Sequence, residues 1–142
     1  MKKESVEKII SQSNSLMNDV VLGTVGILEG VELVWKLDDL LHERGINQKQ
    51  LAEMTGMRVG TISNWVNGKQ GVGINKVQLL AIMSALRVTS ISDIVDIKFP
   101  KDLLLKFEKQ KAEWILEKEM PLEVKEMYRE NLLKSNNLED KK

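Results

Sequence analysis

Three glycines, Gly45, Gly56 and Gly68, divide the middle of the sequence into short segments that each carry apolar residues at helical spacing. Glycine adopts the left-handed conformation that ends a helix at little cost, and Asn47 is a good N-cap for the segment that follows the first glycine. The pattern predicts three short helices in succession, the third over residues 59–66. Their apolar stripes are Leu33, Leu37, Leu40 and Leu41, then Leu51, Ala52 and Met54, then Ile62, Trp65 and Val66.

The segment after Gly68 also favours helices. A fourth helix is expected to carry Val77, Leu80 and Ala81 among its apolar residues, and a fifth to begin near Ser90, where Ser90 and Asp93 resemble a capping box. The whole chain has only 2 Pro and 9 Gly, too few turn-forming residues to favour an all-β fold. We therefore predict an all-α fold.

The two ends of the chain are predicted to be helical extensions. Residues 4–19 favour a helix. From residue 20 to 34 the pattern is less clear, because Gly23, Gly26 and Gly30 weaken a helix while the many Val, Ile, Leu and Thr residues could equally build a short strand, so residues 20–30 are left as a joint of uncertain form. After residue 99 two amphipathic helices are expected, with Pro121 in the first turn of the second. We divide the chain into an N-terminal helical arm and joint (1–30), a central domain (31–98) and a C-terminal helical tail (99–142). Apolar residues of these extensions include Val6, Ile9, Ile10, Leu16 and Met17 in the arm, and Leu103, Leu104, Phe107, Trp114 and Ile115 in the tail.

The composition excludes most enzyme chemistry. The absence of Cys excludes thiolate metal sites and a cysteine nucleophile, and a single histidine, His42, leaves no pair for a metal or a proton relay. The longest apolar stretch, residues 20–28, is well short of the ~20 residues that a membrane span needs, and the N-terminus lacks a signal-peptide pattern. We expect a cytoplasmic protein that is not an enzyme and that uses no cofactor, metal or membrane.

Charge is unevenly distributed along the chain. The total is balanced, with 21 Lys+Arg against 21 Asp+Glu. Residues 44–76 nevertheless carry a net charge of +4, which favours a negatively charged partner for this segment. The cations are Arg44, Lys49, Arg58, Lys69 and Lys76, and the single acid is Glu53.

The segment from Gly45 to Lys69 resembles the helix-turn-helix of the Cro/CI-type (XRE) family of phage, plasmid and bacterial regulators. The resemblance covers residues 31–98 and implies a five-helix Cro/CI-type bundle whose third helix enters the major groove of double-stranded DNA. The residues that carry it are Gln48 at the start of the second helix, Leu51 and Ala52 within it, the Gly56 turn, Ile62 and Trp65 in the third helix, and the Asn67-Gly68-Lys69 exit. Trp65 shares a face with Ile62 and Val66, so we expect it in the core instead of on the DNA.

The resemblance also implies which residues meet DNA. The side chains that face away from the apolar stripe of the third helix are small or form hydrogen bonds, as a helix in the groove requires, and an amide can pair with adenine. Base-reading residues are predicted to be Val59, Gly60, Thr61, Ser63 and Asn64, with Asn64 as the best candidate for direct contact. Phosphate-contacting residues are predicted to be Gln48, Lys49, Arg58, Asn67 and Lys69.

The sequence departs from the family pattern at two places. Leu41 and Val66 occupy positions where many members have an Arg–Glu pair, and an apolar contact there should preserve the fold. Arg58 stands where the family commonly has a Ser or Thr that caps the recognition helix, and it cannot accept the capping hydrogen bond. A phosphate or a guanine close to Arg58 would explain this choice.

The function predicted from these residues is a sequence-specific DNA-binding transcriptional regulator, a repressor of a phage or other mobile element. The amphipathic tail can either cover the bundle of its own subunit or form a homodimer interface, and a homodimer would read two half-sites of an operator. The alternative is an antitoxin or antirepressor-like module that holds a partner protein with the tail. The sequence does not identify the operator or the regulated gene.

Overall fold

The computed structural model describes residues 2–13, 18–70 and 73–140, which form two compact units. The first unit contains residues 31–98 together with the strand at residues 2–5, and the second contains residues 6–30 and the chain after residue 98. The second unit therefore draws on both predicted extensions. Leu16 and Met17 of the predicted N-terminal stripe lie outside the described residues.

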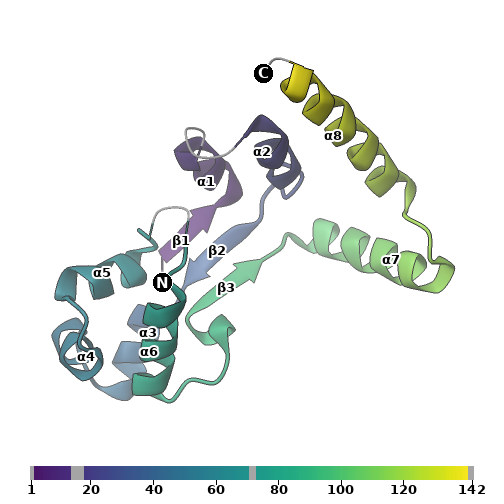
Figure 1. Cartoon of the computed structure of the whole chain (residues 1–142). Helices are drawn as coiled ribbons and strands as arrows, with labels where there is room; N and C mark the ends of the chain where they lie inside the picture. The colour runs from purple at the N-terminus through teal and green to yellow at the C-terminus, as the bar shows by residue number, and fades with distance from the viewer. Residues whose placement is uncertain (1, 14–17, 71–72, 141–142) are drawn as a thin grey trace. The chain divides into compact units, whose positions relative to one another are not determined.

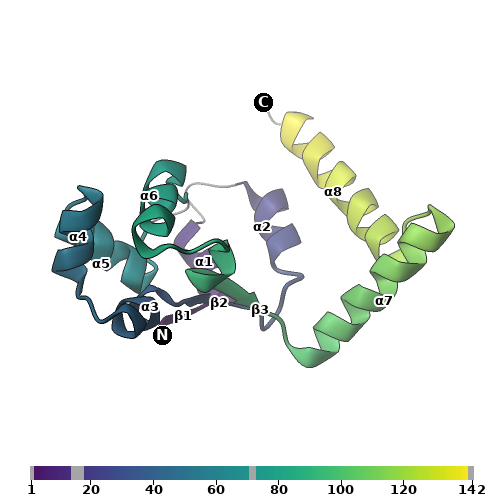
Figure 2. The same cartoon turned by 90° about the horizontal axis from the view of Figure 1, so that it is seen from below.

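The helices of the first unit are α3 (Leu37–Arg44), α4 (Gln48–Thr55), α5 (Val59–Asn67) and α6 (Lys76–Leu86), which lie together beside the strands in Figures 1 and 2. The three predicted glycine ends are confirmed, because Gly45, Gly56 and Gly68 are all left-handed, with φ of 70°, 80° and 71°. The cap at Asn47 is also confirmed. Its Oδ1 accepts a hydrogen bond from the backbone N–H of Gln50 (2.8 Å), and the Gln50 side chain accepts one from the backbone N–H of Asn47 (3.0 Å).

A small antiparallel sheet, which the sequence did not predict, joins three distant parts of the chain. Strands β1 (Lys2–Ser5), β2 (Glu32–Trp35) and β3 (Val95–Lys98) are arranged in the order β1-β2-β3. Trp35 pairs with Lys2 on one side and with Val95 on the other. Leu33, predicted on the first helical stripe, is thus in a strand, because pairing with partners far away in sequence overrides a local helical pattern.

Two predicted helices differ in extent from the structure. The arm helix begins only at Val6, since residues 2–5 form β1. The fifth helix of the bundle is a single 3₁₀ turn, η1 (Ile91–Asp93), because β3 begins two residues later. The Ser90 hydroxyl does not cap this turn and forms a hydrogen bond with the Ser92 hydroxyl (2.8 Å). The fold is predominantly helical, as predicted, with the sheet added at its side.

The core of the first unit is built around two tryptophans. The ring of Trp65 is fully buried and meets Trp35 edge-to-face, with ring centroids 6.4 Å apart and an interplanar angle of 77°. The Trp65 indole N–H donates to Oε1 of Gln78 on α6 (3.0 Å). Leu41 and Val66 are buried in the same core, so the predicted replacement of an ion pair by an apolar pair is confirmed. The other core residues are Leu37, Leu40, Leu51, Ala52, Ile62, Ile82, Leu86, Val88 and Ile94.

In the residues that the structure describes, the elements of the second unit are helices, with α1 (Val6–Ser13) and α2 (Asp19–Val25) from the N-terminal part, and α7 (Lys101–Glu117) and α8 (Leu122–Asp140) from the C-terminal part. Residues 20–30, left open by the sequence, form most of α2 and the turn after it, and Asn18 caps the helix through a hydrogen bond from the backbone N–H of Val21 (2.9 Å). The side-chain amide of Asn131 donates to the hydroxyl of Thr24 (2.9 Å) and links α8 to α2.

Two ion pairs hold the connection between α7 and α8. Lys106 on α7 contacts Glu123 on α8 (N···O 2.7 Å), and Lys125 contacts Glu119 in the loop between the helices. Each lysine donates a hydrogen bond that lowers the pKa of its glutamate below the ordinary value. Helix α8 begins one residue after Pro121, so the proline precedes the helix and is not part of its first turn. No helix in the described part of the chain is long and apolar enough to cross a membrane.

Candidate nucleic-acid interface

Helix α5 has two different faces. One face packs into the core through Ile62, Trp65 and Val66, all of them buried. The other face, opposite at 100° per residue, carries Gly60 and Asn64, which are both exposed. The turn between α4 and α5 consists of Gly56, Met57 and Arg58, and it sets α5 across α4 (Figure 1). A polar helix face is thereby presented on a rigid support.

All the predicted base-reading residues lie on α5. Val59, in the first turn, is 49% exposed, and a Cβ built on Gly60 meets no atom within 4 Å, so a flat ligand can approach the backbone there. Thr61 and Ser63 are half-buried at the sides of this face. Within the described residues, the side chain of Asn64 forms no hydrogen bond. Its amide is therefore available to a ligand, with one donor group and one acceptor.

The predicted phosphate-contacting residues lie at the ends of α4 and α5. Gln48 and Lys49 are the first two residues of α4, where backbone N–H groups point out of the helix and favour an anion. Arg58 immediately precedes α5, and Lys69 follows its C-terminal glycine. Asn67 differs from the others, because its side-chain amide donates to the carbonyl oxygen of Ser63 (2.9 Å) and contacts the Ser63 hydroxyl (3.3 Å). Asn67 thus stabilises the end of α5 and retains only its side-chain oxygen for another contact.

The positive charge of the first unit is partly neutralised and partly free. Arg44 pairs with Glu43 (2.7 Å) and also donates to the carbonyl oxygen of Leu86 (3.2 Å), so it is engaged within the bundle. Lys49, Arg58 and Lys69 are exposed, and none of them forms an ion pair with the residues that the structure describes. The unpaired cations are therefore next to the exposed face of α5. Such a surface attracts a polyanion.

Sequence reasoning missed the residues that fix the C-terminal end of α5. Trp35 lies on β2, outside the helix-turn-helix segment, yet its indole ring packs against Gly68 so closely that a Cβ there would lie 2.4 Å from the indole nitrogen. Gln78, on α6, holds the Trp65 indole. No periodic signal could have found either contact, because both join residues from different elements.

Comparison with known protein families gives one match within the chain. Residues 36–100 match the Cro/C1-type HTH DNA-binding domain. The chain contains a Cro/C1-type helix-turn-helix DNA-binding domain. The matched range includes α3 to α6, η1 and β3 of the first unit, so the Cro/C1-type domain holds every predicted DNA-contacting residue. No match was found among curated proteins or among solved structures. A Cro/C1-type domain supports a role in DNA-binding transcription regulation.

Arg58 precedes α5 at the true N-cap position, with φ −72° and ψ 148°, and its side chain makes no capping hydrogen bond. The predicted helix start is therefore confirmed. Arg58→Ser supplies a capping oxygen and removes a cation from the positive end of the helix dipole, so the free energy of unfolding should rise by about 0.5–1.5 kcal/mol. Affinity for DNA should fall in the same variant. Thermal unfolding without DNA and titration of a DNA fragment at fixed salt measure the two effects. Unchanged affinity would show that Arg58 is a surface charge that does not contact DNA.

Proposed function

We propose that this protein is a sequence-specific transcriptional repressor of a phage or other mobile element, which binds operator DNA through α5. The observation that carries the proposal is the exposed polar face of α5, with unpaired cations at its two ends, inside a Cro/C1-type domain. A repressor needs only to occupy its operator, and nothing beyond this surface is required for that. The cytoplasmic location stays a prediction of the sequence.

The α5 surface divides into residues that read bases and residues that contact the phosphate backbone of the DNA. In this proposal α5 lies in the major groove, where Asn64 pairs with adenine N6 and N7 and Val59 contacts a thymine methyl group. Lys49, Arg58 and Lys69 contact phosphates, with Gln48 and the N-terminus of α4. Phosphate contacts fix the register of the helix on DNA, and the base contacts discriminate between sequences.

We further propose that the regulator acts as a homodimer. One recognition helix contacts few base pairs, and two copies would read half-sites about 34–36 Å apart on one side of the duplex. The C-terminal tail supports this proposal, since Leu104, Trp114 and Ile115 are 46%, 40% and 60% exposed. Exposed apolar side chains in such number mark an interaction surface.

The same exposed apolar residues favour a second candidate, an antitoxin or antirepressor-like module that holds a partner protein with α7 and α8. The two candidates differ in their response to salt. A DNA complex weakens steeply with salt because counterions are released from the phosphates, whereas an apolar protein interface does not.

Selection of bound sites from random double-stranded DNA, followed by titration of the selected site at several salt concentrations, tests the proposal. We expect an enriched motif with two related halves and an affinity that falls linearly on logarithmic axes as salt rises. Failure to enrich any sequence, with binding that is weak at low salt as well, would contradict a DNA-binding role and favour the protein-partner candidate.

Lys69→Ala should weaken binding to all DNA sequences equally and reduce the magnitude of the slope of log K against log salt by about one per subunit. The reason is the loss of one phosphate contact per subunit. Titration of selected and scrambled fragments at several salt concentrations provides the measurement. Lys76→Ala, which removes the same charge at the start of α6, is the matched control and should change the slope less.

A further inference from the structure

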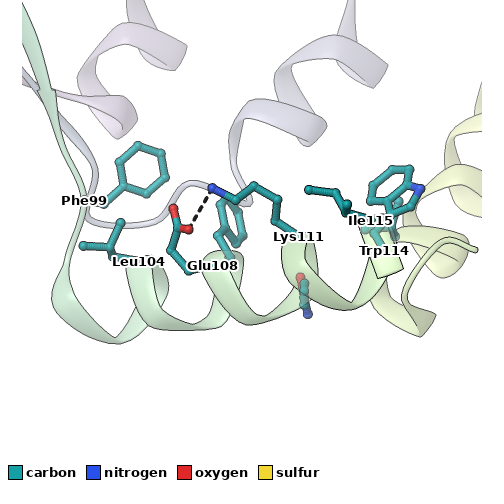
Figure 3. Close-up of a pocket in the computed structure, with 9 residues that line it drawn as sticks. Phe99, Leu104, Glu108, Lys111, Trp114 and Ile115 are labelled. Atoms are coloured by element: carbon teal, nitrogen blue, oxygen red, sulfur yellow. Dashed lines mark ion pairs between the residues drawn. The ribbon is translucent and has the colours of Figure 1, made fainter. Parts of the chain in front are cut away.

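An apolar groove runs along α7 and ends against α8. Its volume is about 610 Å³, and its apolar lining consists of Phe99, Leu104, Phe107, Trp114, Ile115 and Val124. We call it the α7 groove. Figure 3 shows Phe99 and Leu104 at one end of α7 and Trp114 and Ile115 at the other. Phe99 and Phe107 meet edge-to-face, with ring centroids 5.8 Å apart. This contact between the two rings stabilises the apolar wall of the groove at its Phe99 end.

One ion pair lies in the middle of the α7 groove. Glu108 and Lys111 are one helical turn apart on α7, with 2.7 Å between Oε2 and Nζ (Figure 3). Both side chains are more than half exposed, at 57% and 61%. An exposed pair of this kind adds little to the stability of its own helix, and its two charges can accept new partners.

The residues of α7 are complementary to those of a second, antiparallel copy of the same helix. About a midpoint between Lys109 and Gln110, Leu104 corresponds to Ile115, and both line the groove. About the same midpoint, the acid Glu108 corresponds to the base Lys111, and both also line the groove. Among the residues that line the groove, an apolar residue thus corresponds to an apolar residue, and the acid corresponds to the base.

We propose that the α7 groove is occupied by the α7 groove of a second copy of this chain, with a two-fold axis that passes near Lys109 and Gln110. This inference rests on the homodimer proposed above and specifies its interface. In the dimer, Glu108 of each copy pairs with Lys111 of the other, and the apolar ends of the two grooves cover each other. A two-fold interface must be self-complementary in this way, because each residue pair occurs twice.

Charge complementarity favours a second copy over an unrelated partner. A groove with a single sign of charge would select a partner of the opposite charge, but the α7 groove has one acid and one base at its centre. Residues 99–142 have 10 basic and 10 acidic residues, so two tails do not repel each other. Like charges that face each other across an interface suppress the wrong partner, and this effect allows a direct test.

Two charge variants test the interface without DNA. Glu108→Lys places two bases on each copy, and Lys111→Glu places two acids, so each variant alone should show a dimer dissociation constant raised by about tenfold or more. An equimolar mixture of the two should restore dimers, because every lysine then faces a glutamate. Analytical ultracentrifugation of each variant and of the mixture is the measurement, and circular dichroism verifies that the exposed substitutions leave the helices intact.

A cysteine variant tests the position of the axis. The chain has no native cysteine, so a single substitution gives a clean signal. Lys111, which lines the groove on the face proposed to meet the partner, is offset from its own symmetry mate by about 4.5 Å along the helix axis, so Lys111→Cys should form a disulfide-linked dimer under mild oxidation. Leu116→Cys is the matched control, because its mates would be about 20 Å apart along that axis and should not link.

The outcomes separate this inference from the proposed function. Wild-type protein that stays monomeric at high concentration, or charge variants whose mixture does not associate better than each alone, would overturn the α7 interface. Either result could be obtained with a protein that still binds its selected DNA, so the repressor proposal would stand. Restored association in the mixture, together with the Lys111→Cys link and no Leu116→Cys link, would support the antiparallel dimer.

Discussion

Gly68→Ala should destabilise the Cro/C1-type domain by roughly 2–4 kcal/mol, the largest effect that we expect from a single methyl group. Two costs add together. Gly68 has φ +71°, where an L-residue is strained, and its new Cβ would lie 2.4 Å from Nε1 of Trp35. Trp35 cannot move away easily, because its ring packs on the buried Trp65.

Gly45→Ala is the matched control for the Gly68 variant. Gly45 has nearly the same left-handed conformation, φ +70°, but a Cβ at this position meets nothing within 4 Å. This variant should lose only the conformational part, about 1 kcal/mol. Urea unfolding of both proteins, followed by tryptophan fluorescence, gives the two free energies. Equal losses would show that the contact between Gly68 and Trp35 adds no strain.

Asn64→Ala should lower affinity for the selected operator by roughly 1–3 kcal/mol per half-site and remove the preference at one base pair. The reason is that an amide on the exposed face of α5 can pair with one adenine at two atoms, and alanine cannot. Binding to unrelated DNA should change little, since no phosphate contact is lost. Titration against a panel of operators with each base pair changed in turn measures this loss of preference.

Lys69→Ala is the contrasting variant for this panel. It should shift all the affinities together, whereas Asn64→Ala should flatten the response at a single position. Identical profiles for the two variants would contradict the division of the surface into base-reading and phosphate-contacting residues.

The helix-turn-helix could be predicted from the sequence because its signals are local. A glycine that ends a helix, an asparagine that begins one and an apolar stripe between them all act within a few residues. For this reason the cap at Asn47, the end of α4 at Gly56 and the N-cap position of Arg58 were predicted correctly, and α5 ends only one residue later than predicted. The predicted DNA contacts on these helices remain predictions.

The sheet could not be predicted in the same way, because its strands pair across the chain. β2 pairs with β1 and with β3, and neither partner is near it in sequence. Leu33 fits a helical stripe and a strand equally well, and only the partners decide between them. The role of the Asn67 side chain could not be predicted from the residue type either, because an asparagine suits both a phosphate contact and a helix end. Its hydrogen bond to Ser63 is seen only in the structure.

The two units are completed at different stages of protein synthesis, because the first unit ends at β3 and the second needs α8. Thr24 and Asn131, which join α2 to α8, are 107 residues apart in sequence, so the second unit cannot be completed until the ribosome has passed Asn131. The first unit has all its residues once synthesis has passed β3. A nascent chain therefore acquires its Cro/C1-type domain before the helices of its second unit can close, and the α7 groove, which Val124 of α8 helps to line, is completed after that domain.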